Sequence, residues 1–228
     1  MARNVVREAR DYLESLAPPF FRALVHYASD GSYSWHCPGH SGGVAFLKSP
    51  VGRMFHQFFG ENMLRADVCN AVDELGQLLD HTGPVAASER NAARIFSADH
   101  LFFVTNGTST SNKIVWHSTV APNDIVVVDR NCHKSILHAI MMTGAIPVFL
   151  MPTRNHYGII GPIPKSEFKW ENIRKKILAN PFARETLERD PEAKPRVLTI
   201  TQSTYDGILY NVEIIKEMLD GKIDTLHF

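Results

Sequence analysis

The chain has 228 residues, of which 44% are hydrophobic, 21% charged and 10% aromatic, values typical of a globular protein. This composition argues against a disordered chain, a collagen-like repeat and a coiled coil. Lysine plus arginine and aspartate plus glutamate both number 24, so no net field attracts a polyanion, and nucleic acid is not an expected partner.

The N-terminal stretch predicts two short helices. Asn4 is placed to cap the first of them, and Pro18 and Pro19 separate it from the second. The apolar face of the first helix consists of Val5, Ala9, Leu13 and Leu16. The sequence has no apolar leader region and no run of about eighteen apolar residues, so we expect a cytoplasmic protein without a membrane partner.

A loop rich in glycine and proline follows, and it contains His36 and His40. Two histidines at this spacing can bind zinc when they lie on one face of a helix. Pro38 and Gly39 between them prevent that helical face. We therefore interpret both histidines as loop-ordering or dimer-interface residues and expect no metal site.

Helices and apolar runs alternate in the rest of the chain. Ser49 and Pro50 predict the start of a helix that Gly60 ends. Strands are expected at residues 101–104, 125–128, 146–150, 196–201 and 223–228, and helices at 89–96, 108–119, 133–143, 170–179 and 212–219. Continuous β-branched runs mark strands buried on both faces. The pattern predicts an α/β domain: three α/β/α layers with a mostly parallel sheet.

The three cysteines are scattered and show no CxxC spacing. This spacing argues against a disulfide framework and against a thiolate zinc site. We expect each of them, Cys37, Cys69 and Cys132, to be a small buried hydrophobic residue.

Ligands of open α/β sheets bind at the carboxyl ends of the strands, so the segments that follow the strands are the candidate sites. In the first, residues 105–111, a glycine turn places hydroxyls and free backbone N–H groups at a helix N-terminus. That geometry binds a phosphate dianion, although a simple helix cap with extra hydroxyls is the alternative. Neither GxxxxGK[ST] nor GxGxxG occurs, which disfavours a P-loop or a Rossmann dinucleotide site.

Two further segments follow strands, at residues 129–135 and 201–207. His133 opens a helix, where it could stack on a planar cofactor, relay a proton or simply cap the helix. The polar residues of the third segment carry little information alone.

Six blocks of the sequence, in order over nearly the whole chain, resemble the bacterial ornithine/lysine/arginine decarboxylases. The blocks are HxPGH at 36–40, ELxxLLDHTG at 74–83, VTNGTS at 104–109, DRNCHKS at 129–135, NHYGIIGP at 155–162 and STYDG at 203–207. Members of this family are fold-type-I enzymes that use pyridoxal 5′-phosphate, and their fold is similar to that of aspartate aminotransferase.

The resemblance implies roles for individual residues. His133 matches a catalytic histidine that lies over the pyridine face, orients the cofactor and supports substrate protonation. Thr204 matches a hydroxyl residue near the cofactor. The phosphate is expected to be held at Gly107, Thr108, Ser109 and Thr110.

The resemblance also implies the activity, which is decarboxylation of arginine, lysine or ornithine to the corresponding amine. Residues 1–71 are expected to be a linker or dimerisation segment, and residues 72–228 the N-terminal part of the cofactor-binding major domain. In the family, a block like residues 226–228 is directly followed by the aspartate that pairs with the ring nitrogen, and the Schiff-base lysine comes later. We therefore expect a fragment that lacks both residues and the family's outer domains.

The full-length protein is expected to form a homodimer or a higher homo-oligomer. Two alternatives remain open. One is another fold-type-I reaction, such as transamination. The other is a truncated, non-catalytic subunit or regulator that binds full-length decarboxylase.

Overall fold

The computed structural model describes residues 2–30, 35–69 and 72–228. It divides into two compact units, Met1–Phe103 and Val104–Phe228, each of which is described by itself. The domain boundary expected at residue 71 stays a prediction, since a compact unit need not coincide with a domain of a longer protein.

The first unit consists of helices and turns. Ser49 caps the third α-helix by accepting a hydrogen bond from the N–H of Gly52 at 3.0 Å, and Gly60 ends that helix, as predicted. Asn4 lies inside the first helix, so its prediction as a cap was wrong. The helical elements are α1 (Ala2–Leu16), α2 (Pro19–Ser29), η1 (Val44–Lys48), α3 (Pro50–Phe59), α4 (Glu61–Arg65), η2 (Asp73–Leu75) and α5 (Gly83–Ile95).

Two predictions near the end of this unit need correction. Helix α5 begins at Gly83 rather than at residue 89, because Pro84 has no N–H to lose and fits the first turn of a helix. The predicted strand at residues 101–104 does not form. Instead of joining a ladder, the backbone N–H of Phe103 donates to the buried carboxylate of Glu89 at 2.9 Å.

The second unit confirms the predicted α/β fold. Its four strands are parallel and lie in the order β2-β1-β3-β4. The elements are α6 (Thr108–Thr119), β1 (Ile125–Asp129), α7 (Lys134–Thr143), β2 (Ile146–Leu150), η3 (Lys165–Phe168), α8 (Trp170–Ala179), η4 (Pro181–Ala183), α9 (Arg184–Arg189), β3 (Val197–Thr199), α10 (Val212–Leu219) and β4 (Thr225–His227).

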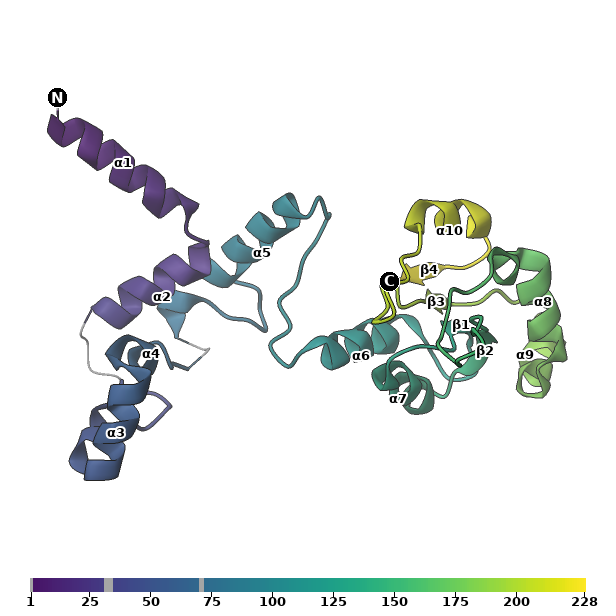
Figure 1. Cartoon of the computed structure of the whole chain (residues 1–228), viewed down its shortest axis with the longest axis horizontal. Helices are drawn as coiled ribbons and strands as arrows, with labels where there is room; N and C mark the ends of the chain where they lie inside the picture. The colour runs from purple at the N-terminus through teal and green to yellow at the C-terminus, as the bar shows by residue number, and fades with distance from the viewer. Residues whose placement is uncertain (1, 31–34, 70–71) are drawn as a thin grey trace. The chain divides into compact units, whose positions relative to one another are not determined.

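Helices cover both faces of this sheet, which gives three layers (Figure 1). On one face, Trp116 of α6 and Ile136 of α7 pack against alternate strand residues such as Val126. On the other face, α8 and α10 cover the remaining strand residues with Ile173, Ile177, Ile215 and Leu219. Strand β1 is buried along its whole length, as its run of β-branched residues predicts.

The connections diverge between β1 and β3. From β1 the chain passes through α7 to β2, whereas from β2 it crosses through α8 to β3 on the other side of β1. Such a point of divergence leaves a crevice outside the carboxyl ends of the two strands, where ligands of this fold class bind.

The three cysteines are less buried than predicted. Cys37 is exposed, and Cys69 and Cys132 are partly buried, so the expectation that all three are buried was wrong.

Among the described residues, no helix combines the length and the apolar character needed to cross a bilayer.

Candidate functional site

Helices α6 and α7 both begin at the carboxyl edge of the sheet. Helix α6 runs into β1 and α7 leaves it, so both helices are antiparallel to the strand and their N-termini share one edge. The side-chain amide of Asn112, in α6, donates to the hydroxyl of Ser135, in α7, at 2.8 Å. The first two predicted segments, residues 105–111 and 129–135, therefore lie together.

The start of α6 is an open cradle for an anion. Gly107 caps the helix with φ of +81°, and no atom lies within 4 Å of where a Cβ would stand. Among the described residues, none accepts a hydrogen bond from the backbone N–H of Thr108 or Ser109. Both of these side chains are exposed. Two free N–H groups and two hydroxyls at a helix N-terminus suit a phosphate.

Thr110 differs from its two neighbours. Its hydroxyl donates to the backbone oxygen of Asn106 at 3.2 Å and accepts from the amide of the same residue at 3.1 Å. The hydroxyl would have to leave these partners to reach a bound phosphate. The cradle as it stands is formed by residues 107–109.

His133 occupies the N-cap position of α7, directly after the turn that follows β1. Its Nδ1 atom accepts the backbone N–H of Ser135 at 3.2 Å and lies 2.9 Å from the hydroxyl oxygen of the same serine. The His133 residue as a whole is exposed. The capping role that we considered is present, and it leaves the Nε2 side of the ring available to a ligand.

Thr204 lies in a turn that follows β3. Its hydroxyl accepts the N–H of Ile208 at 3.2 Å, and its carbonyl accepts the N–H of Gly207. Thr201, three residues earlier, donates to the backbone oxygen of Asn131 at 3.4 Å. This contact joins the segment after β1 to the segment after β3. Thr204 lies in the second of these segments, three residues after Thr201.

Asp129, the last residue of β1, was not singled out as a candidate from the sequence. It is 1% exposed, and its Oδ1 atom accepts the N–H of Asn131 at 2.7 Å. Its Oδ2 atom has no hydrogen-bond partner among the described residues. Burial raises the pKa of this carboxyl, and the N–H groups of Asn131 and Thr201 offset the rise in part. The sequence contained one sign of this site, because Asp129 is a charged residue at the end of a strand that is otherwise entirely apolar.

A short chain of hydrogen bonds, buried at Trp116 and Thr199, joins α6 to the ends of two strands at this edge. Trp116 donates to the hydroxyl of Thr199 at 3.2 Å, and that hydroxyl lies 3.2 Å from Nδ1 of His227. Burial lowers the pKa of His227, which favours its neutral form. These contacts join α6, β3 and β4.

The opposite edge of the sheet carries a cleft of about 500 Å³. There, Arg196 pairs with Asp224 at 2.6 Å and with Asp124 at 3.7 Å. Because these residues precede the strands, the cleft lies at the amino ends, away from the candidate site.

The two loop histidines have local partners. His40 accepts the N–H of Gly43 on Nδ1 at 3.0 Å, and its Nε2 lies 3.1 Å from Asp67. His36 contacts the hydroxyl of Tyr27. These contacts agree with a loop-ordering role. In the part of the chain that the structure describes, no group of three or more metal-binding side chains is present.

Comparison with known proteins agrees with the blocks identified above. The sequence model of the family described as "Orn/Lys/Arg decarboxylase, major domain" matches residues 18–228. Over 228 residues, the chain is 61% identical to a lysine decarboxylase of Pseudomonas aeruginosa and 44% identical to the biodegradative arginine decarboxylase of Escherichia coli. Each alignment covers 100% of this chain but only 30% of the relative, so the chain spans about a third of the length of these relatives.

A solved structure leads to the same family. Lysine decarboxylase A from Pseudomonas aeruginosa matches with a TM-score of 0.89 and 62% identity, over 100% of this chain and 30% of that one. The match to the family's major domain includes both helix N-termini at the sheet edge, because residues 18–228 contain α6 and α7. The chain therefore belongs to the ornithine/lysine/arginine decarboxylase family.

Proposed function

We propose that residues 72–228 are the N-terminal part of a pyridoxal 5′-phosphate domain in an enzyme that decarboxylates a basic amino acid. The observation that carries this proposal is the shared edge of the sheet. An open anion cradle at residues 107–109 begins α6, a ring residue, His133, caps α7, and a hydrogen bond from Asn112 to Ser135 joins the two helices near these ends. Together with the family, this arrangement supports a phosphorylated planar cofactor.

The residues present fit such a cofactor. The backbone N–H groups of Thr108 and Ser109, their hydroxyls and the dipole of α6 complement a phosphate dianion, and the positive φ of Gly107 opens the turn. His133 is exposed at the same edge and can lie against a planar ring. Thr204 and Thr201 follow β3, across the point where the connections diverge.

When bound, pyridoxal 5′-phosphate supplies the sink for the electrons that loss of the α-carboxylate leaves on the substrate. The work of this chain is to anchor and orient. Residues 107–109 hold the phosphate, and His133 restricts the rotation of the ring and offers its Nε2 side to the substrate. The buried hydrogen bond from Trp116 to Thr199 holds α6, and with it the phosphate cradle, in place on the sheet.

Lysine is the first substrate to test. The relative at 61% identity is a lysine decarboxylase, whereas the arginine decarboxylase is 44% identical. Arginine and ornithine remain within the proposal, because the comparison covers only 30% of these relatives.

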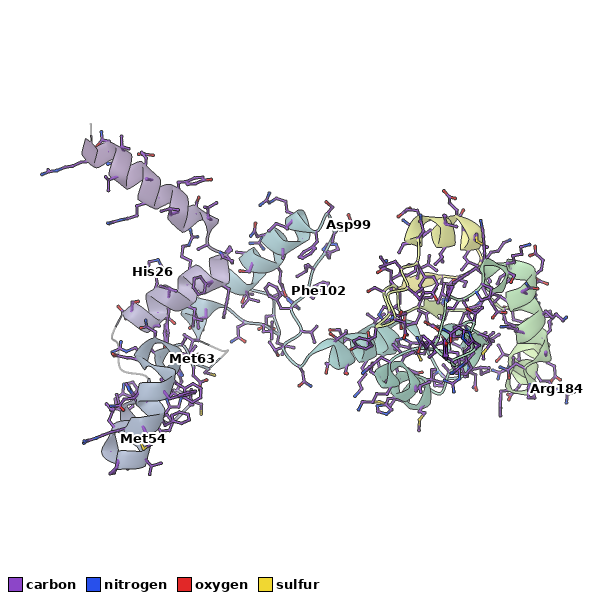
Figure 2. The ribbon with its side chains drawn as sticks, viewed as in Figure 1. His26, Met54, Met63, Asp99, Phe102 and Arg184 are labelled. Carbon is purple, nitrogen blue, oxygen red and sulfur yellow. The ribbon has the colours of Figure 1, made fainter. Side chains whose placement is uncertain are left out.

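The proposal includes self-association, which the first unit supports. Its helices expose large apolar side chains, and Figure 2 shows Met54 on α3 and Met63 on α4, which are 69% and 61% exposed. In α1, Val5 and Leu13 are 63% and 65% exposed. Apolar surface of this extent is typical of a surface that packs against another subunit.

A product assay tests the proposal. It uses a protein that contains these 228 residues and has the full length of the family's members, called here the family-length protein. Lysine, arginine and ornithine are supplied separately with pyridoxal 5′-phosphate, and carbon dioxide, amine and keto acid are measured. We expect carbon dioxide and amine in equal amounts, with lysine the fastest. A keto acid as the main product would favour transamination, and no product from any of the three would contradict the proposal.

A further inference from the structure

The ring of His133 is held by a chain of hydrogen bonds that starts in α6. Asn112 donates its amide N–H to the hydroxyl oxygen of Ser135 at 2.8 Å, and this oxygen lies 2.9 Å from Nδ1 of His133. Ser135 is 2% exposed, so its hydroxyl, at the centre of this chain, is shielded from water. The same Nδ1 also accepts the backbone N–H of Ser135 at 3.2 Å.

These contacts determine which ring nitrogen carries the proton. A backbone N–H can only donate, so the Nδ1 that it meets must present a lone pair. Because Asn112 already donates to the oxygen of Ser135, the serine hydroxyl is free to donate its own proton to Nδ1 as well. The ring proton of neutral His133 therefore lies on Nε2, since the partner of one ring nitrogen sets the state of the other.

The position of Asn112 links this ring to the phosphate cradle. Asn112 follows Thr108 by four residues and Ser109 by three, so the three residues lie on one face of α6. The helix that would hold the phosphate at its first turn thus sets the ring of His133 from its second turn.

We propose that Asn112 and Ser135 are positioning residues, which hold the His133 ring in one orientation with its Nε2–H directed outward as a hydrogen-bond donor. This inference rests on the proposed function for its meaning in catalysis. A fixed donor at this edge suits an anionic group of a bound amino acid, such as its carboxylate. Neither Asn112 nor Ser135 needs to touch substrate or cofactor for this role.

The tautomer of His133 can be read directly, without cofactor. The 228-residue chain is labelled with ¹⁵N at its 11 histidines, and the ring nitrogens are observed by long-range proton–nitrogen correlation. The variant His133→Gln assigns the signal that disappears. We expect Nδ1 of His133 to be unprotonated and Nε2 protonated. A protonated Nδ1, or a mixture like that of a free histidine, would overturn the inference.

Variants test whether Asn112 and Ser135 set this state. Asn112→Ala and Ser135→Ala each remove a hydrogen bond from the chain, so we expect the ratio of the Nδ1–H to the Nε2–H form to rise about two- to tenfold. Ser135→Thr keeps the hydroxyl and should restore the wild-type ratio. Ser118→Ala is the control, because the hydroxyl of Ser118 donates to the backbone oxygen of Val115, near the far end of the same helix.

The outcomes separate this inference from the proposed function and from a merely structural role. A lower melting temperature in Asn112→Ala with an unchanged tautomer ratio would assign Asn112 to packing alone and overturn the inference. If Asn112→Ala does not fold, the tautomer ratio of His133 is measured in the wild type and in Asn112→Asp. A carboxylate at residue 112 would draw the serine proton away from Nδ1, so we expect the Nδ1–H form to increase in Asn112→Asp. If the His133 ring is fixed in the 228-residue chain but the family-length protein binds no pyridoxal 5′-phosphate, the proposed function is refuted and the positioning role of Asn112 and Ser135 still holds.

Discussion

Trp116 of α6 donates its indole N–H to the hydroxyl of Thr199 in β3 across 3.2 Å, from a position that is 0% exposed. The contact fixes the helix that begins with the phosphate cradle onto a central strand of the sheet. The rest of the indole packs among Val126, Val128 and Ile136, so the same side chain provides both a polar anchor and core volume.

Trp116→Phe should therefore destabilise the second unit. The variant loses one buried hydrogen bond and leaves a small cavity, which together cost about 1–3 kcal/mol. Trp35→Phe is the matched control, because Trp35 is 96% exposed. The measurement is the free energy of unfolding in urea. Equal values for the two variants would show that the indole anchor contributes nothing.

Ser109→Ala should weaken the binding of pyridoxal 5′-phosphate by about ten- to a hundredfold, because it removes a charge-assisted hydrogen bond to phosphate. Thr110→Val should lower the affinity by less than about threefold, since the Thr110 hydroxyl is already bonded to Asn106 and would gain little from a phosphate. The affinity is measured by titrating the family-length protein with cofactor. A larger loss in Thr110→Val than in Ser109→Ala would reverse the assignment of these two hydroxyls.

The pH dependence of stability should depend on Asp129. Burial raises the pKa of its carboxyl, so the folded state binds this proton more tightly than the unfolded chain does. The stability from the protonated form is fully present below the ordinary pKa of a carboxyl and is lost as the pH rises through the raised value. Asp129→Asn cannot ionise and still offers an acceptor to the N–H of Asn131.

We therefore expect the wild type to lose stability relative to Asp129→Asn as the pH rises above about 4, the ordinary pKa of a carboxyl. Urea unfolding at a series of pH values measures the difference, and Asp220→Asn, at an exposed position, is the control. Parallel curves for Asp129→Asn and the wild type would mean that the buried carboxyl does not titrate with folding.

The 228-residue chain by itself is expected to release no carbon dioxide from lysine, arginine or ornithine. If the Schiff-base lysine follows the block at residues 226–228, as the resemblance implies, the cofactor would have no covalent attachment in this chain. The assay mixes the purified chain with pyridoxal 5′-phosphate and each amino acid in turn. Turnover by this chain alone would refute the expectation that the lysine lies beyond these residues.

The sequence predicted the second unit well because its signals are local. The apolar run at 125–128 and the glycine before α6 each specify their own element, and both predictions were confirmed. The run at 101–104 has the same composition as a strand, but a strand also needs a neighbour. There Glu89 takes the N–H of Phe103 instead, and no local pattern contains that information.

The site was predictable at the level of segments and not of contacts. Residues just after strands are the places where this fold class binds ligands, which singled out 105–111 and 129–135. The bond from Asn112 to Ser135 depends on how α6 and α7 pack, and the two residues lie 23 positions apart in the chain. The unpartnered oxygen of Asp129 likewise results from burial in three dimensions.

The edge formed by α6 and α7 is proposed to bind and orient pyridoxal 5′-phosphate for decarboxylation. The most direct measurement compares turnover and cofactor affinity of the family-length protein with those of His133→Ala. His138→Ala is the control, because His138 is an exposed histidine on the same helix.

We predict that His133→Ala lowers kcat for lysine at least about tenfold while the cofactor affinity falls much less, because the phosphate stays anchored at residues 107–109 and only the orientation of the ring is lost. His138→Ala should match the wild type in both quantities. Unchanged kcat in His133→Ala, or a loss equal to that of His138→Ala, would contradict the account.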